Sequence, residues 1–182
     1  MSLGRLRRVL LVGFMGAGKT TVGRRVAAGL GWRFVDFDDA VEAEAGLSVA
    51  EIFELHGEAH FRALEADVGR RLLTVDRVVL GSGGGWAPRN RAGLHDVPEG
   101  TATFWLKVSA EEAARRAAAQ AVVRPLLAGP DALATASRLL LERASAYGEA
   151  RWTVDTDGLS VDDVSARILT ILAGEYSDTD AE

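Results

Sequence analysis

The most specific chemical signal in the chain is the segment 13–20, Gly-Phe-Met-Gly-Ala-Gly-Lys-Thr, which matches the phosphate-loop pattern G-x-x-x-x-G-K-[ST]. Glycines let backbone N–H groups converge on phosphate oxygens, and a following helix directs its positive N-terminus at them. Lys19 is one of two lysines, which makes a chance glycine turn a weaker explanation. The pattern predicts a nucleotide site in which Lys19 reaches the terminal phosphates and the Thr20 hydroxyl ligates Mg²⁺.

Two aspartates follow the next apolar run, Phe-Val-Asp-Phe-Asp at residues 34–38. As a short strand, this run places Asp36 and Asp38 on one face at its carboxyl end, beside the phosphate loop. One acid can hold the water shell of a metal ion, and the other can accept a hydrogen bond from a substrate hydroxyl. The alternative is a solvated acidic turn at a strand end.

Further along the chain, an arginine and a run of glycines suggest a second binding region. Phe61, Arg62 and Glu65 fall on one predicted helix, and an arginine there can clamp a carboxylate through two parallel hydrogen bonds. Gly83, Gly84 and Gly85 follow a predicted strand, where close backbone approach to a ligand requires residues without Cβ. An ordinary surface arginine remains the alternative for Arg62.

Additional arginines occur after the fourth predicted strand, at Arg115, Arg116 and Arg124. An insertion at this point of an α/β fold can form a mobile lid that brings arginines over a transferring phosphate. Arg124 precedes a proline that ends helix, which favours a functional position, whereas a solvated helix surface also explains Arg115. Arg143 carries no signal of its own beyond its residue type.

The apolar pattern of the chain supplies the elements that position these residues. Strands are predicted at residues 9–12, 34–38, 77–80, 101–108 and 152–155, and helices at 20–30, 48–56, 58–73, 110–121, 131–146 and 161–172. Alternating strands and helices predict a three-layer α/β sandwich with a five-stranded, mostly parallel sheet. Its site is expected at the carboxyl ends of the strands.

Length and composition favour one domain. With 182 residues of which 48% are hydrophobic, the chain can bury one sizeable core, predicted over residues 1–174 with a substrate segment at about 36–73 and a lid at about 115–128. The acidic stretch 175–182 is predicted to be a disordered tail. A net charge of −5 argues against nucleic-acid or membrane partners, and the absence of cysteine fits the cytoplasm. We expect a monomer.

Taken together, these motifs resemble the shikimate kinase family. The likeness runs through G-F-M-G-A-G-K-T-T, F-V-D-F-D, F-R-x-x-E, G-G-G, R-P-L-L-A-G and the R-x-x-x-Y at Arg143 and Tyr147. It implies a fold similar to that of nucleoside monophosphate kinases. It also implies transfer of the ATP γ-phosphate to the 3-hydroxyl of shikimate, with one Mg²⁺ ion, in the chorismate pathway.

The resemblance also implies roles for individual residues. Lys19, Asp38 and Arg124 would act in catalysis, and Thr20 and Asp36 would serve the metal. ATP would contact Gly16, Ala17, Gly18, Lys19, Thr20, Thr21, Arg116 and Arg124. Shikimate would contact Asp38, Phe61, Arg62, Glu65, Gly83, Gly84, Gly85 and Arg143.

The chain departs from the family pattern at several places. Trp86 follows the three glycines where a small residue is common, the lid is rich in alanine, and the proline expected between Arg143 and Tyr147 is missing. A gluconate-type or other small-metabolite kinase of the same fold is the alternative function. A nucleotide-binding homologue without catalysis is a further alternative.

Overall fold

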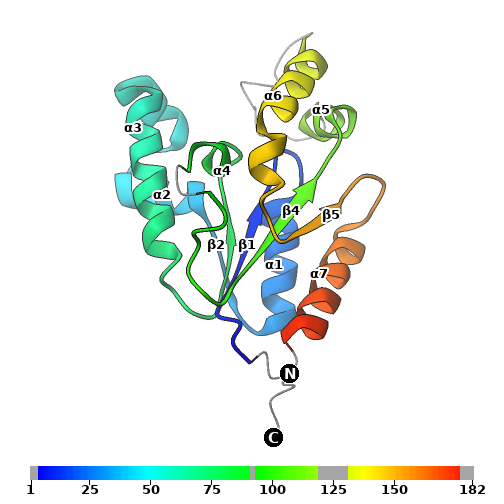
Figure 1. Ribbon diagram of the computed structural model, residues 1–182. Coiled ribbons are helices and arrows are strands. Elements are labelled where there is room, and N and C mark those ends of the chain that lie inside the picture. The colour runs from blue at the N-terminus through cyan, green and yellow to red at the C-terminus, as the bar shows by residue number, and fades with distance from the viewer. Residues whose placement is uncertain (1–3, 91–92, 119–130, 177–182) are drawn as a thin grey trace, which may run out of the picture.

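A parallel sheet organises the chain in the computed structural model, which describes residues 4–90, 93–118 and 131–176 (Figure 1). Its five strands lie in the order β2-β3-β1-β4-β5, and each neighbouring pair is parallel. The strands are β1 (Arg8–Val12), β2 (Arg33–Asp36), β3 (Val78–Gly81), β4 (Thr101–Lys107) and β5 (Trp152–Asp155). The predicted α/β fold is confirmed, and the sheet is wholly parallel. The carboxyl ends of all five strands therefore face the same edge.

Helices cover both faces of this sheet, as adjacent residues of β4 demonstrate. Phe104 stacks on Trp152 of β5 with ring centroids 5.0 Å apart, and Trp152 contacts Tyr176 of α7 (Val161–Tyr176). The next residue, Trp105, faces the opposite way and contacts Tyr147 of α6 (Ala132–Tyr147) at 5.9 Å. Since neighbouring strand residues point to opposite faces, α7 and α6 lie on opposite sides of the sheet.

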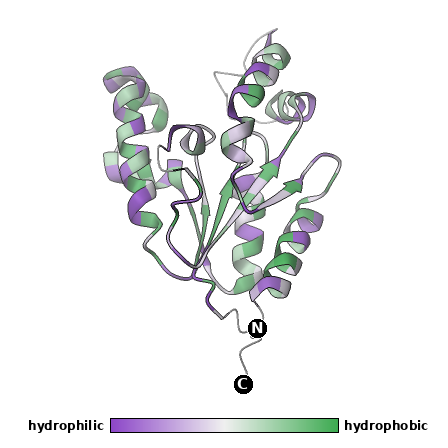
Figure 2. Cartoon of the chain, in the orientation of Figure 1, coloured by the Kyte–Doolittle hydropathy of each residue, from purple (hydrophilic) through white to green (hydrophobic). Residues whose placement is uncertain are grey.

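The remaining helices complete the two outer layers. On the α7 side, α1 (Lys19–Leu30) packs against α7. On the other side, α6 contacts both α4 (Trp86–Arg89) and α5 (Ala110–Ala118). In Figure 2 the strands between the layers are mostly hydrophobic, while polar residues occupy the outer sides of the helices. The central strand β1 has all five residues buried, which is why its sequence is a continuous apolar run.

A side lobe, formed by α2 (Phe37–Ala45) and α3 (Val49–Leu72), has its own small core of Val41, Ile52, Phe61 and Val68. Ser48 and Glu51 form a capping box at the start of α3. Gly57 interrupts the helix with φ 80° and ψ 170°, as its position in the sequence indicated. The lobe therefore contains a kinked helix whose longer part, beyond Gly57, carries Arg62 and Glu65.

Several predicted boundaries were wrong. The second strand ends at Asp36, because the Asp36 side chain accepts a hydrogen bond from the Asp38 N–H and caps a helix that begins at Phe37. The short helix α4 was not predicted. The last helix continues to Tyr176, where the ring packs on Trp152, so residues 175 and 176 are helical and do not belong to a tail.

At the start of α5, Ser109 and Glu112 form only half of a capping box. The Ser109 hydroxyl accepts from the Glu112 N–H at 3.2 Å, but the Glu112 carboxylate pairs with Arg115 and Arg116 instead of returning to Ser109. Most of the predicted lid, including Arg124, lies outside the described residues. Within the described ranges, no helix has both the length and the apolar character needed to cross a membrane.

Candidate active site

The phosphate loop connects β1 to α1, as its sequence predicts. Gly13 takes φ 142°, and a Cβ there would lie 2.4 Å from the carbonyl oxygen of Leu106 in β4, so only glycine fits. The Lys19 ammonium group donates hydrogen bonds to the carbonyl oxygens of Gly13 and Phe14, at 2.8 and 3.0 Å. These contacts direct the Lys19 side chain back over the phosphate loop.

A hydroxyl and a carboxylate meet directly beside this loop. The Thr20 hydroxyl donates to Asp36 Oδ2 at 2.8 Å, and the other carboxylate oxygen of Asp36 caps α2. The two residues come from α1 and from the end of β2, which are brought together by the sheet order. Hydroxyl and carboxylate oxygens suit Mg²⁺, so the predicted metal residues form a donor pair of the right chemistry.

Asp38 lies in the first turn of α2, and not on a strand as the sequence suggested. Burial raises the pKa of its carboxyl group from 3.8 to about 6, and the negative charges of Asp36 and Glu65 add to the effect. Lys19 and Arg62 act in the opposite direction. Asp38 is therefore within electrostatic range of both the phosphate loop and the arginine of α3.

The partly buried Arg62 and the buried Glu65 form an ion pair on α3. Arg62 donates to Glu65 Oε2 at 2.7 Å, and the Glu65 side chain is only 2% exposed. Burial nevertheless raises the pKa of Glu65, and the charges of Arg62, Arg89 and Arg143 only partly offset it. Only one of its oxygens has a hydrogen-bond partner among the described residues. The other oxygen, Oε1, faces Gly83, where a Cβ would approach it to 2.0 Å. A side chain at position 83 would therefore have to displace the Glu65 carboxylate.

Phe61 lies behind this pair and not at its open side. It is buried in the core of the side lobe, and its ring lies 4.9 Å from the Arg62 guanidinium carbon. Such a contact fixes the orientation of an arginine through its cation–π interaction. The predicted substrate residue Phe61 therefore supports Arg62, and nothing in its burial exposes it for contact with a ligand.

The glycine run is held by α6. The Gly84 carbonyl oxygen accepts hydrogen bonds from Arg143, at 3.0 Å, and from the Tyr147 hydroxyl. Arg143 is 8% exposed and also lies over the ring of Phe14, 5.7 Å away, in the phosphate loop. Its position is well defined although the proline of the family motif is missing. Arg143 thus contacts the glycine run and the phosphate loop together.

Arg116 links three segments at the other side of the phosphate loop. It donates to the carbonyl oxygens of Gly16 and Thr156, at 3.0 and 2.8 Å, and pairs with Glu112. The two arginines that hold Glu112 lower the pKa of its carboxyl group to about 2. Arg116 therefore contacts the phosphate loop directly, whereas Arg124, the other predicted lid arginine, lies outside the described residues.

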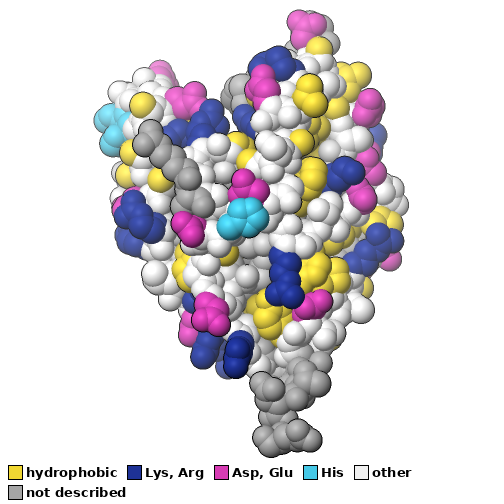
Figure 3. Space-filling model, in the orientation of Figure 1, with side chains coloured by type: hydrophobic (Ala, Val, Ile, Leu, Met, Phe, Trp, Pro, Cys, Tyr) yellow, Lys and Arg dark blue, Asp and Glu magenta, His cyan; other side chains and the backbone are white. Residues whose placement is uncertain are grey.

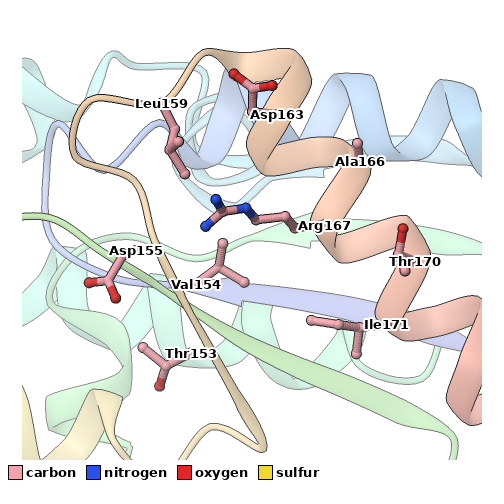
Figure 4. A pocket seen from close by; sticks show the side chains of 9 residues that line it. All are labelled: Thr153, Val154, Asp155, Leu159, Asp163, Ala166, Arg167, Thr170 and Ile171. Carbon is pink, nitrogen blue, oxygen red and sulfur yellow. The ribbon is translucent and has the colours of Figure 1, made fainter.

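The space-filling view shows a notch between the side lobe of α2 and α3 and the helix α6, with Lys or Arg side chains along it (Figure 3). A cavity of about 570 Å³ adjoins this region and is lined in part by Arg62, Glu65, Trp86 and Arg89. A larger cavity, of about 710 Å³, lies between β5 and α7, and Arg167 crosses it (Figure 4). None of the predicted site residues lines the larger cavity.

The sequence did not single out Arg89 and assigned no contact to Tyr147. Arg89 sits on the unpredicted helix α4, so no periodic signal located it. Tyr147 was visible only as part of R-x-x-x-Y, and its contact with Gly84 depends on tertiary packing. Among the predicted site residues, the structure brings Lys19, Asp38, Arg62, Glu65, Arg143 and the glycine run close to one another, whereas Phe61 lies in the core of the side lobe.

A phosphate loop after β1, a Thr–Asp donor pair and an arginine-rich notch on a parallel sheet define a P-loop kinase. The family model for "Shikimate kinase" matches residues 15–173. A shikimate kinase from Nitrobacter winogradskyi is 47% identical over 148 residues, covering 81% of this chain and 68% of the relative. The chain belongs to the shikimate kinase family, and it is an ATP-dependent kinase.

Two solved structures agree with this assignment. A shikimate kinase from Bacteroides thetaiotaomicron superposes with a TM-score of 0.84 at 29% identity, covering 91% of this chain and 98% of that chain. A shikimate kinase from Acinetobacter baumannii, in complex with shikimate, has a TM-score of 0.79 at 31% identity, covering 93% and 95%.

Proposed function

We propose that this protein transfers the γ-phosphate of ATP to the 3-hydroxyl of shikimate. The observation that carries the proposal is the convergence of Arg62 and Arg143 on the glycine run next to Asp38. Such a group of residues suits an acceptor that has both a carboxylate and hydroxyls. The Acinetobacter relative that contains shikimate supports the same acceptor.

At the nucleotide end, the backbone of residues 16–21 and the Lys19 ammonium group bind the phosphates in this proposal. Thr20 and Asp36 would hold one Mg²⁺ ion. When bound, the metal neutralises charge that develops on the phosphates. Arg116 borders the nucleotide, since it already contacts the loop carbonyl of Gly16.

At the acceptor end, Asp38 orients the attacking hydroxyl and accepts its proton as the oxygen bonds to the γ-phosphorus. The bond from that phosphorus to the bridging oxygen of ADP breaks, and ADP leaves. A pKa of about 6 suits this role, because the carboxylate is ionised at neutral pH and still basic enough to take a proton. Arg62, Arg143 and the glycine run hold the carboxylate end of the acceptor, and Glu65 orients Arg62.

Arg124 completes the proposal as a lid residue that contacts the transferring phosphate. The support is its place after β4 in an arginine-bearing insertion, residues 115–128. Arg124→Ala is expected to lower kcat, by up to about 10³-fold if it acts as arginines do in related phosphoryl transfers. Arg124→Lys is expected to restore part of the loss, since it keeps the charge without the planar fork.

An acceptor panel in a coupled ADP-release assay tests the proposed function. With ATP and Mg²⁺, shikimate is expected to give the highest kcat/KM, ahead of gluconate, quinate and nucleoside monophosphates. Higher turnover with gluconate would favour the alternative kinase, and no turnover with any acceptor would favour the non-catalytic homologue. The cytoplasm is the proposed compartment, because the reaction consumes ATP and the chain has no cysteine.

A further inference from the structure

A second arginine faces Arg62 at the glycine run. If Gly85 carried a Cβ, that atom would lie 2.7 Å from Nη1 of Arg89 and 3.1 Å from both Nη1 and Nη2 of Arg62. The two guanidinium groups therefore converge on one point beside the backbone of Gly85. Both also line the cavity of about 570 Å³ that adjoins the acceptor end.

The direction of Arg89 is fixed by the helix that carries it. Trp86, at the start of α4, meets the ring of Phe37 edge-on, with centroids 5.3 Å apart and planes at 87°. The indole occupies space that a side chain at position 69 would need, since a Cβ on Gly69 would lie 2.6 Å from its Nε1. The bulky residue after the glycine run thus anchors α4, and Arg89 is placed one helical turn later.

Two like charges at this distance need a counter-charge, and Glu58 supplies it. One oxygen of its carboxylate, Oε1, accepts from Arg62 Nε at 3.3 Å and from Arg89 Nη2 at 3.1 Å. Glu58 follows the kink at Gly57, and its side chain is 54% exposed. A solvent-exposed carboxylate therefore bridges the same two arginines that converge at Gly85.

We propose that Arg89 is a third arginine of the acceptor-carboxylate site, and that Glu58 occupies the Arg62–Arg89 pair until the acceptor carboxylate displaces it. The inference rests on the proposed function and extends it. The geometry favours a carboxylate over other anions, because the group that bridges the arginines in this structure is itself a carboxylate. An exposed ion pair is weak, so Glu58 can be exchanged at small cost.

The charge of Arg89 also reaches the rest of the acceptor end. It lowers the pKa of Glu65, together with Arg62 and Arg143, and it lowers the pKa of Tyr147. For both groups burial has the larger effect and raises the pKa. Arg89 is thus within electrostatic range of the residues that hold Gly84, as a third binding arginine must be.

Four single substitutions test the proposal. Arg89→Ala is expected to raise KM for shikimate about 5- to 10-fold, leaving KM for ATP and kcat nearly unchanged, because an acceptor-binding charge is lost. Arg89→Lys is expected to recover part of this loss. Glu58→Gln is expected to lower KM for shikimate by roughly twofold, because it removes the competing carboxylate.

Arg70→Ala is the matched control, since Arg70 lines the same cavity but pairs with Asp67 and does not approach Gly85. It is expected to leave all three constants unchanged. Opposite shifts for Arg89→Ala and Glu58→Gln would support displacement, whereas a merely structural network would weaken binding in both variants. Equal KM values for native protein and Arg89→Ala, or a raised KM for Glu58→Gln, would overturn the proposal.

Titration calorimetry of shikimate with each protein separates this inference from the proposed function. Binding without phosphoryl transfer would contradict the proposed function, and the Arg89 comparison would then be decided by the dissociation constants. If the native protein phosphorylates shikimate and Arg89→Ala binds shikimate with the native dissociation constant, the Arg89 inference alone would be overturned. Absence of any shikimate binding by the native protein would contradict both.

Discussion

The nucleotide end and the acceptor end of this site are built in different ways. The core of the nucleotide end is one continuous segment, the phosphate loop and the start of α1, which works mainly through backbone groups; Asp36 and Arg116 adjoin it from β2 and α5. The acceptor end is assembled from four separate places: α2, α3, the glycine run with the adjoining α4, and α6. A local sequence pattern can encode the first, whereas the second exists only once the sheet and the side lobe have formed.

The two ends also differ in their electrostatics. At the nucleotide end, Lys19 and the Thr20 hydroxyl both have hydrogen-bond partners. At the acceptor end, burial raises the pKa of Asp38 and of Glu65, and Glu65 Oε1 has no partner among the described residues. Carboxyl groups whose pKa is raised by burial are typical of functional sites. A substitution at the nucleotide end should therefore change mainly kcat, whereas a substitution at the acceptor end should change mainly KM for shikimate.

Lys19→Ala is expected to have the largest effect. The lysine acts on charge that develops at the phosphates, so kcat should fall roughly 10²–10³-fold. The melting temperature should stay near that of the native protein, because the helix start is held by the loop backbone. Steady-state kinetics and a thermal melt measure both, and undiminished turnover in a folded variant would refute the nucleotide-end assignment.

Arg62→Ala is expected to act on the acceptor alone. Loss of a desolvated partner of a carboxylate typically costs about 2–5 kcal/mol, so KM for shikimate should rise by at least tenfold, with KM for ATP little changed. The methyl ester of shikimate should be a poor substrate of the native enzyme for the same reason. A parallel rise of both KM values would mean that the two ends are not separable.

The stability of an Asp38→Asn variant tests the burial of that carboxylate. The folded-state pKa of about 6 lies above 3.8, so the folded protein binds the extra proton and the ionised group destabilises the fold as pH rises. Asn removes this penalty. The free energy of unfolding should increase by about 1–3 kcal/mol above pH 6, and the gain should vanish below about pH 4.

The same group sets the pH profile of the native enzyme. Activity, as kcat/KM for shikimate, should decline as pH falls through about 6, because protonated Asp38 cannot accept the hydroxyl proton. Denaturant unfolding of the variant and a pH–rate profile of the native protein give the two readings. A stability gain independent of pH, or an acid limb near pH 4, would argue against the raised pKa.

Tyr147→Phe should give the smallest effect. The Gly84 carbonyl loses one of its two donors but keeps Arg143, so the cost is that of one hydrogen bond, about 0.5–1.5 kcal/mol of stability. KM for shikimate should rise by no more than a few-fold, and KM for ATP should not change. A large loss of kcat instead would assign Tyr147 a direct role in the reaction.

The outcome of the sequence predictions follows the same division. The strand β1, the loop and the helix α1 were predictable because an apolar run, glycines and a lysine occur in one short segment. The helix α2 was missed because residues 34–38 have the pattern of one strand. In the structure Asp36 ends that strand and caps the helix. The four-residue helix α4 has no periodic pattern, so Arg89 was invisible. The contacts of Glu58 with Arg89 and of Tyr147 with Gly84 depend on tertiary packing, which spacing alone does not reveal.

The central claim, that a general phosphate loop is joined to an acceptor end specific for shikimate, is tested most directly by the structure of the product. Native protein, ATP, Mg²⁺ and shikimate should yield one new phosphate ester, with phosphorus coupled to the proton on C3 of the ring in ³¹P–¹H NMR. Phosphorylation of another hydroxyl, or consumption of ATP with no ester formed, would contradict the account.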